Sequence, residues 1–113
     1  MSGITTHVLD TVEGRPAAGV PLVLERFDGS RWIEVGRGET DADGRQRALV
    51  PSGTAVGAGR YRMHFDTGVY FAKTKTTAFY PEVSVVFEIV DASAHYHVPL
   101  LLAPFGFSTY RGS

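Results

Sequence analysis

The sequence predicts an all-β fold, a β-sandwich of seven or eight short strands with one small helix. Several short segments alternate apolar and polar residues with a period of two, as strands with one buried face do. Thirteen glycines and six prolines are dispersed along the 113 residues, which fits the turns of a many-stranded protein. We therefore predict a single domain over residues 1–113 with one hydrophobic core of modest size.

The first half of the chain is predicted to form three strands joined by tight turns. Residues 4–9 form the first strand, which ends before a turn at Gly14-Arg15-Pro16. Residues 20–25 alternate in polarity and form a second strand with a buried face. Asp28-Gly29 marks a hairpin turn that leads into a third strand near residues 32–36.

The second half is predicted to contain one turn, one helix and four strands. Asp41-Ala42-Asp43-Gly44 is a tight turn with Arg45 directly after it. Asp66-Thr67 is placed to cap a short helix that runs through Ala72. The predicted strands cover residues 61–65, 83–89, 95–102 and 107–111.

Composition excludes several classes of function. The net charge is −1 with acids and bases interspersed, so bulk charge attracts neither nucleic acid nor an anionic membrane. The absence of cysteine excludes disulfides, thiolate metal sites and a cysteine nucleophile. The chain has no run of about 20 apolar residues and no basic segment leading into an apolar stretch near its start. We expect a cytoplasmic protein, or a peroxisomal one if the source is eukaryotic, without membrane or nucleic-acid partners.

Four histidines are the candidate proton-transfer groups, because histidine titrates near neutral pH. His95 and His97 are two residues apart in a predicted strand and share one face of it. His7 lies on the N-terminal strand, whose polar face also carries Thr5. Taken singly, each of these histidines fits an ordinary strand position, and His64 is assigned that structural role.

Metal binding and covalent catalysis are alternative uses of these residues. His95-x-His97 with His7 supplies the three ligands of a catalytic zinc, but the spacing alone does not establish that these strands meet. Asp41-x-Asp43-Gly44 lacks the glutamate that a calcium loop requires. No Gly-x-Ser-x-Gly elbow is present for a serine nucleophile. We predict no metal and no cofactor, and a site that activates water against a small polar ring.

Two segments resemble the signatures of the transthyretin family. The first is residues 7–17, HVLDTVEGRPA, and the second runs from Tyr96-His97-Val98-Pro99 to residue 108. The resemblance covers residues 4–113. It implies two four-stranded sheets packed face to face with one short helix. It also implies a homotetramer, a dimer of dimers, with active sites in the channel between dimers and the C-terminal strand lining them.

Four markers separate the two branches of that family. The hormone-carrier branch has lysine where His7 stands. The branch that hydrolyses 5-hydroxyisourate is marked by this histidine, by an arginine after the Asp-Gly turn, by Tyr-His-Val-Pro and by a terminal Tyr-Arg-Gly-Ser. This chain has all four, at His7, Arg45, His97 and Tyr110 to Ser113, and departs from the family pattern at Ala103, where serine is usual.

The resemblance implies the role of each marker in opening the lactam ring of 5-hydroxyisourate. His7 and His97 position and deprotonate water, and one of them later protonates the departing ring nitrogen. Arg45 stabilises the developing oxyanion. The C-terminal residues hold the substrate ring, through Tyr110, Arg111 and Ser113.

Three questions remain open at this point. The sequence does not say which of His7 and His97 is the base, and it gives no role to His95. A carrier of a small aromatic ligand in the same channel is the alternative function. A structural sandwich module, whose histidines have no function of their own, is a third candidate function.

Overall fold

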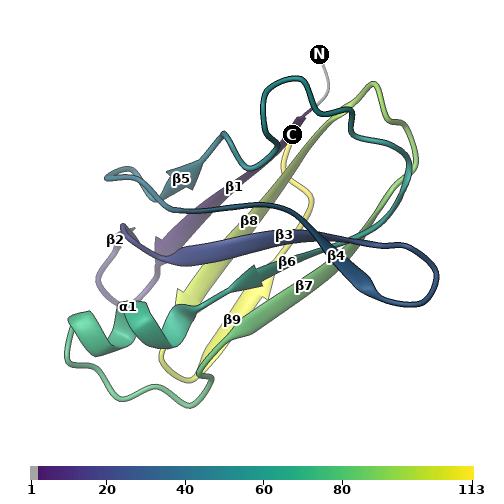
Figure 1. Ribbon diagram of the computed structural model, residues 1–113. Coiled ribbons are helices and arrows are strands. Elements are labelled where there is room, and N and C mark those ends of the chain that lie inside the picture. Colours follow the sequence, from purple (N-terminus) through teal and green to yellow (C-terminus); the bar gives the residue numbers. More distant parts are fainter. Residues whose placement is uncertain (1–2) are drawn as a thin grey trace.

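The computed structural model describes residues 3–113. It consists mainly of two sheets packed face to face (Figure 1). One sheet has the strand order β2-β1-β8-β9, and β5 pairs with β1 on the edge that β2 also uses. Its strands are β1 (Gly3–Asp10), β2 (Arg15–Pro16), β5 (Arg45–Gln46), β8 (His95–Ala103) and β9 (Gly106–Thr109). The second sheet, in the order β4-β3-β6-β7, consists of β3 (Pro21–Phe27), β4 (Trp32–Glu39), β6 (Gly59–Phe65) and β7 (Val83–Ile89).

The predicted β-sandwich with one short helix is confirmed. The first sheet has five strands rather than four, because the two residues after the 41–44 turn pair with β1 as β5. Within it, β1 and β8 run parallel, with Thr5 opposite His97 and His7 opposite Pro99. This pairing joins segments from the two ends of the chain, and it brings the predicted N-terminal and C-terminal site residues onto one sheet.

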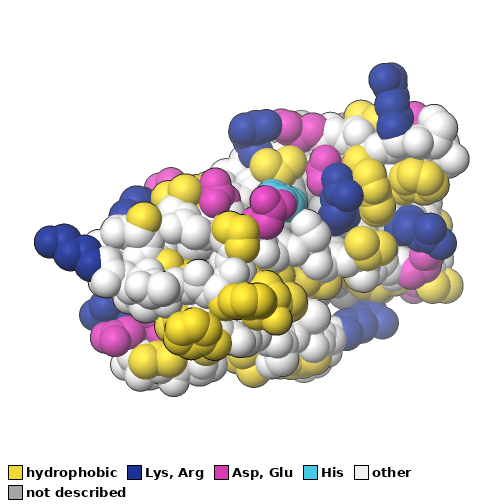
Figure 2. Space-filling view, turned by 90° about the horizontal axis from the view of Figure 1, so that it is seen from below, with side chains coloured by type: hydrophobic (Ala, Val, Ile, Leu, Met, Phe, Trp, Pro, Cys, Tyr) yellow, Lys and Arg dark blue, Asp and Glu magenta, His cyan; other side chains and the backbone are white. Residues whose placement is uncertain are grey.

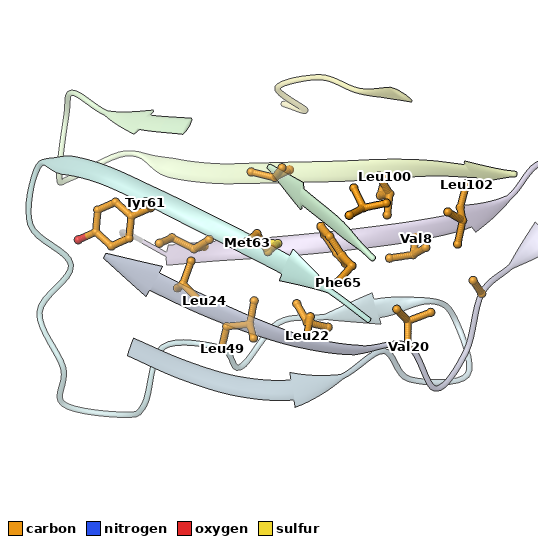
Figure 3. Packing of buried hydrophobic residues seen from close by; sticks show 14 of the residues in the cluster. Val8, Val20, Leu22, Leu24, Leu49, Tyr61, Met63, Phe65, Leu100 and Leu102 are labelled. Atoms are coloured by element: carbon orange, nitrogen blue, oxygen red, sulfur yellow. The ribbon is translucent and has the colours of Figure 1, made fainter. Parts of the chain in front are cut away.

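The core lies between the sheets and follows the alternation seen in the sequence (Figure 3). Alternate side chains of β1 and β8 point inward, and their neighbours point to the outer face of the sheet. Opposite them, β3 and β6 supply inward-pointing residues in the same way. The largest fully buried side chains include Leu22, Leu24, Tyr61, Met63, Phe65, Leu100 and Leu102.

Several predicted boundaries differ from the observed ones by one or two residues, and three differences bear on the fold or the site. Arg15 and Pro16 are not part of a turn but form β2, because the turn closes earlier, with the Gly14 amide donating to the Asp10 carbonyl. The third predicted strand continues from residue 36 to Glu39, paired with β3 along its length. The last strand starts one residue earlier than predicted and ends at Thr109, so residues 110 and 111 lie beyond it.

A buried polar contact connects the short helix α1 (Thr67–Lys73) to β1. The Tyr70 hydroxyl donates to Oδ2 of buried Asp10 at 2.7 Å. Burial, and then this hydrogen bond, raise the pKa of Tyr70 to about 12, so the hydroxyl stays a donor at neutral pH. Asp66 precedes the helix as predicted, but its side chain makes no capping hydrogen bond.

The surface carries both signs of charge. Figure 2 shows the molecule of Figure 1 from below, and on this face acidic and basic side chains are interspersed with hydrophobic ones. Exposed aromatic residues include Phe79 and Phe107, each packed edge-on against Tyr80. No helix within residues 3–113 is long and apolar enough to cross a membrane.

Candidate functional site

Three neighbouring strands place His7, Arg45 and His97 on the outer face of the first sheet. His7 on β1 is the direct cross-strand partner of Arg45 on β5. On the other edge of β1, Thr5 is the partner of His97 on β8. Thr6 and Val8, on either side of His7, are buried in the core, so the alternating residues Thr5 and His7 point outward. The residues that the sequence singled out as the catalytic set therefore share one surface.

The turn at residues 41–44 fixes the position of Arg45. One oxygen of the Asp41 carboxylate accepts hydrogen bonds from the backbone N–H groups of Asp43 and Arg45, at 2.9 and 3.0 Å. Gly44 has a φ of +74°, and a Cβ there would lie 2.4 Å from the carbonyl oxygen of Val8. Only glycine combines this backbone conformation with such a close approach to β1. The Asp-Gly pair thus holds the start of β5 against β1.

The same turn orients the ring of His7. Its Nε2 lies 2.9 Å from the backbone carbonyl oxygen of Asp43. A carbonyl oxygen only accepts hydrogen bonds, so Nε2 carries the proton and donates it. In the neutral ring the lone pair is consequently on Nδ1. The turn therefore sets both the tautomer of His7 and the backbone position of the neighbouring Arg45.

His97 is held by a hydroxyl group and surrounded by cationic or ionisable neighbours. Its Nδ1 lies 2.8 Å from Oγ1 of Thr5, and the same oxygen lies 3.0 Å from Nε2 of His95. Partial burial is the largest cause that lowers the pKa of His97 below its ordinary value of 6.5, followed by the charge of Arg45 and then by His7 and His95. His97 is therefore neutral near pH 7.

A surface depression of about 410 Å³ lies beside His97. Two arginines and two imidazoles converge on it, a combination suited to a polar substrate rich in carbonyl oxygens. Its lining residues are Thr5, Thr6, Arg45, Arg47, His95, His97 and Ser113. His7 is not part of this lining and lies beside it, next to Arg45.

The C-terminal tail crosses directly over His97. The Gly112 amide donates to the His97 carbonyl at 2.8 Å, in an isolated bridge between the two residues. A Cβ on Gly112 would lie 2.5 Å from Cδ2 of the His97 ring, a distance that requires the ring to move. The backbone of the tail therefore forms one wall against the imidazole, and Ser113 follows it into the depression.

The structure separates the other two predicted tail residues from this depression. Tyr110 and Arg111 line a different cavity of about 360 Å³, beside β7. The guanidinium carbon of Arg111 lies 4.4 Å from the ring centroid of Tyr96. Within the single chain, only Ser113 of the predicted substrate-binding tail residues meets His97 in one cavity.

Three residues of the site were not selected from the sequence. Arg47 follows Arg45 by two positions, and a period-two pattern after the turn is the signal that points to it. Thr5 was placed on the correct face, but its contact with both imidazoles depends on the pairing of β1 with β8. Gly112 lies within the Tyr110 to Ser113 marker but received no role there, because its small size matters only against a ring 15 positions away in the chain.

The zinc arrangement that was weighed for His7, His95 and His97 does not form in the described residues. Across residues 3–113, no three histidine, aspartate or glutamate side chains come together as a metal site. The rings of His95 and His97 instead meet at the hydroxyl of Thr5.

Comparisons with known proteins agree on one family. The model of the HIUase/Transthyretin family matches residues 4–112. The chain is 47% identical over 110 residues to a 5-hydroxyisourate hydrolase of Salmonella dublin, covering 97% of this chain and 80% of the relative. It is similar to the structure of the Klebsiella pneumoniae 5-hydroxyisourate hydrolase, with a TM-score of 0.86, 37% identity and full coverage of both chains.

The fold is shared by a protein crystallised with a hormone. Sea bream transthyretin in complex with thyroxine has a TM-score of 0.88 and 32% identity, covering 97% of this chain and 94% of that one. Fold similarity alone therefore does not separate hydrolysis from ligand carriage, and the side chains of the site have to do so.

Proposed function

The chain belongs to the HIUase/Transthyretin family, and we propose that it hydrolyses 5-hydroxyisourate at the site around His97. The reaction adds water across a lactam bond and opens the six-membered ring. The product is 2-oxo-4-hydroxy-4-carboxy-5-ureidoimidazoline. The observation that carries the proposal is the cross-strand pairing of His7 with Arg45 beside a neutral His97.

Water activation needs an unprotonated nitrogen close to the substrate carbonyl. His97 supports this role, because its lowered pKa leaves the ring neutral at the pH of the cell. His7 supports it too, because its Nε2 is bound to the Asp43 carbonyl and its Nδ1 carries the lone pair. We assign both histidines to positioning and deprotonating water, and one of them to protonating the ring nitrogen as the C–N bond breaks.

Arg45 stabilises the charge that develops on the substrate carbonyl oxygen. A guanidinium group donates several hydrogen bonds in a fixed plane and stays charged at all relevant pH values. The Asp41 turn fixes the backbone of Arg45 before any substrate arrives, which limits the reorganisation needed as the oxyanion forms. Arg47 lies in the same depression and adds positive charge on the substrate side.

Assembly of four chains would complete the site. We propose a homotetramer, a dimer of dimers, in which the outer face of the first sheet lines a central channel. Several large apolar side chains are exposed in the single chain and suit burial between subunits, namely Val86, Phe105, Phe107 and Tyr110. In such an assembly Tyr110 and Arg111 serve the substrate site through contacts between subunits. Sedimentation equilibrium measures the number of chains directly.

Carriage of an aromatic ligand is the alternative function. In the carrier branch a lysine stands at the position of His7, and the set of His7, Arg45 and His97 is not needed to hold a ligand. A carrier binds without consuming its ligand, whereas this site contains a lowered-pKa base beside an oxyanion-stabilising cation, which is a catalytic combination.

One spectrophotometric experiment tests the proposal. Urate oxidase generates 5-hydroxyisourate in the cuvette, and the decay of its ultraviolet absorbance is followed with and without the protein. We expect decay far above the spontaneous rate, and a loss of about 10²–10⁴-fold in kcat for His7→Asn. The matched control is His64→Asn, whose ring contacts Ser84 and Glu82 on the other sheet, and which should keep the wild-type rate. Decay at the spontaneous rate from folded protein would instead favour the carrier.

A further inference from the structure

A threonine hydroxyl lies between two imidazoles at the edge of the proposed site. Oγ1 of Thr5 is 2.8 Å from Nδ1 of His97 and 3.0 Å from Nε2 of His95, both within hydrogen-bond range. His97 is partly buried beside the depression, whereas His95 is exposed. The three groups thus form a hydrogen-bonded chain from the proposed catalytic ring to solvent.

The backbone makes this arrangement specific. Parallel pairing sets Gly3 opposite His95 and Thr5 opposite His97, with all four residues on the outer face. A Cβ on Gly3 would lie 3.4 Å from Nδ1 of His95, which is van der Waals contact, so the His95 ring packs directly beside the start of β1. Thr5 is β-branched and in a strand, which restricts its χ1 rotation and keeps the hydroxyl between the rings.

The single proton of the Thr5 hydroxyl gives the hydrogen-bonded chain a direction. A threonine hydroxyl has one proton to donate and two lone pairs to accept with, so it donates to only one of the two imidazoles at a time. In one arrangement Nδ1–H of His97 donates to Thr5, and Thr5 donates to Nε2 of His95. In the other, both hydrogen bonds run the opposite way: Nε2–H of His95 donates to Thr5, and Thr5 donates to Nδ1 of His97. The two arrangements differ in whether Nε2 of His97 carries a lone pair or a proton.

We propose that His95 and Thr5 form a proton relay that serves His97, with Thr5 as the positioning residue, in the hydrolysis proposed above. Nε2 of His97 removes a proton from water as the water oxygen bonds to the carbonyl carbon. Nδ1 of His97 passes its proton to Oγ1 of Thr5, whose own proton moves to Nε2 of His95. The positive charge then rests on His95, which is exposed to solvent, rather than on partly buried His97.

The return step balances the reaction. When the C–N bond of the ring breaks, Nε2 of His97 gives its proton to the departing nitrogen. Thr5 then returns a proton to Nδ1 of His97, and Nε2 of His95 restores the hydroxyl of Thr5. One water is consumed, one C–O bond forms, one C–N bond breaks, and the three residues regain their starting protonation. The relay lets one ring act first as base and then as acid.

The surroundings of His97 explain why a relay is useful there. Arg45 and Arg47 face it from the segment after the turn, His7 from β1 and His95 from β8. Those neighbours and its partial burial disfavour a lasting positive charge on the ring. A hydroxyl that carries the charge to the exposed ring of His95 lowers this cost, because water solvates a charge there better than on partly buried His97.

The test combines nitrogen NMR of the histidine rings with kinetics. In ¹⁵N-labelled wild-type protein, the two ring nitrogens of His97 report its tautomer and its titration without any substrate present. We expect Thr5→Val, which keeps the shape and removes the hydroxyl, to change the tautomer population of His97. Thr5→Ser should restore the wild-type pattern in part. Identical His97 spectra and titrations in wild type and Thr5→Val would overturn the relay.

Kinetics separates proton transfer from simple positioning. Thr5→Val should lower kcat by about 10- to 10²-fold with KM within about twofold, the lower part of the range for general acid–base catalysis. His95→Gln keeps a hydrogen-bonding partner for Thr5 but cannot accept a proton, and should lower kcat to a similar degree. Thr5→Ser should retain most of the activity. Wild-type kcat in His95→Gln would exclude the relay.

Two controls keep this result apart from the proposed function. Thr11→Val removes a hydroxyl that bonds to the Leu102 carbonyl at the far end of β1, and should leave kcat unchanged. Inactivity of the wild-type protein toward 5-hydroxyisourate would overturn the proposed function, while the NMR comparison would still decide whether the hydrogen-bonded chain exists.

Discussion

Two adjacent threonines show how differently the two faces of one sheet are used. Thr6 points into the core, is fully buried, and donates to the backbone carbonyl of Val98 at 2.6 Å. Thr5 points outward, and its hydroxyl meets the rings of His95 and His97. Both threonines bridge β1 to β8, but Thr6 satisfies a buried backbone group and Thr5 contacts groups that titrate.

The same contrast runs along both strands. Inward residues such as Val8 and Leu100 are packed without exposed surface, and their contribution is burial of apolar area. Outward residues such as His7 and His97 contribute little to that core and are held by hydrogen bonds and by neighbouring backbone. Changes on the inner face should therefore cost stability, and changes on the outer face should cost rate.

Deletion of residues 110–113 should give the largest effect on rate among the changes to the C-terminal tail. It removes the Gly112 bridge to His97 and takes Ser113 out of the depression, while the core between the sheets keeps its residues. We expect kcat to fall by about 10²-fold or more, because misplacement of a catalytic group by about 1 Å already costs that much. The absorbance assay measures the rate, and circular dichroism with thermal melting shows whether the fold persists. Unchanged kinetics would show that the tail is not part of the site.

Leu100→Ala should have the largest effect on stability. Its side chain is fully buried, and a leucine-to-alanine change in a core costs about 2–5 kcal/mol of unfolding free energy. Activity per folded molecule should stay within about twofold of wild type. Urea denaturation measures the unfolding free energy, and the absorbance assay, normalised to the amount of folded protein, measures the activity. Leu101→Ala, on the outer face of the same strand, is the matched control and should lose less stability. Equal losses at both positions would contradict the contrast between the faces.

Gly112→Ala should slow the reaction through a single methyl group. The new Cβ would meet the His97 ring at 2.5 Å and displace it from Thr5 and the depression. A loss of about 10-fold in kcat is expected, smaller than for the deletion, because the backbone bridge can persist. Gly106→Ala is the control on the same C-terminal segment, because a Cβ there meets nothing within 4 Å. Similar losses in both variants would show that the His97 contact is not responsible.

The pH dependence of stability should give the smallest effect. Since the pKa of His97 is lowered on folding, the unfolded chain binds more protons than the folded one between the folded pKa and the ordinary value of 6.5. This contribution to stability is complete above about pH 6.5 and is lost as the pH falls toward the folded pKa. Thermal melting across that pH window should show a melting temperature that rises with pH, and His97→Asn should reduce the slope of this rise. An unchanged slope in His97→Asn would assign the dependence to other groups.

Much of the fold could be predicted from local patterns. Residues 61–65 and 83–89 alternate clearly, and both became strands with the expected buried faces. The ends of elements were less predictable, because they depend on partners elsewhere in the chain. β2 exists because Arg15 and Pro16 meet the end of β1, and β9 stops where the chain leaves its pairing with β8.

The sequence by itself determined the period-two pattern that divides each strand into an inner and an outer face, and the Asp-Gly turn that places Arg45. It also identified the family through its two signature segments, which the comparisons confirm. These features are local, so a short stretch of residues suffices to specify them. The roles of Tyr110 and Arg111 in substrate binding stay predictions.

Only the tertiary structure decided which groups touch one another on the outer face. Thr5 and His97 are 92 positions apart, and the parallel register of β1 with β8 is what brings the hydroxyl to the imidazole. The fit of Gly112 against the same ring depends on where the tail crosses β8. Register and crossing follow from the burial of the inner faces of both sheets, so the core sets the geometry of the site that lies outside it.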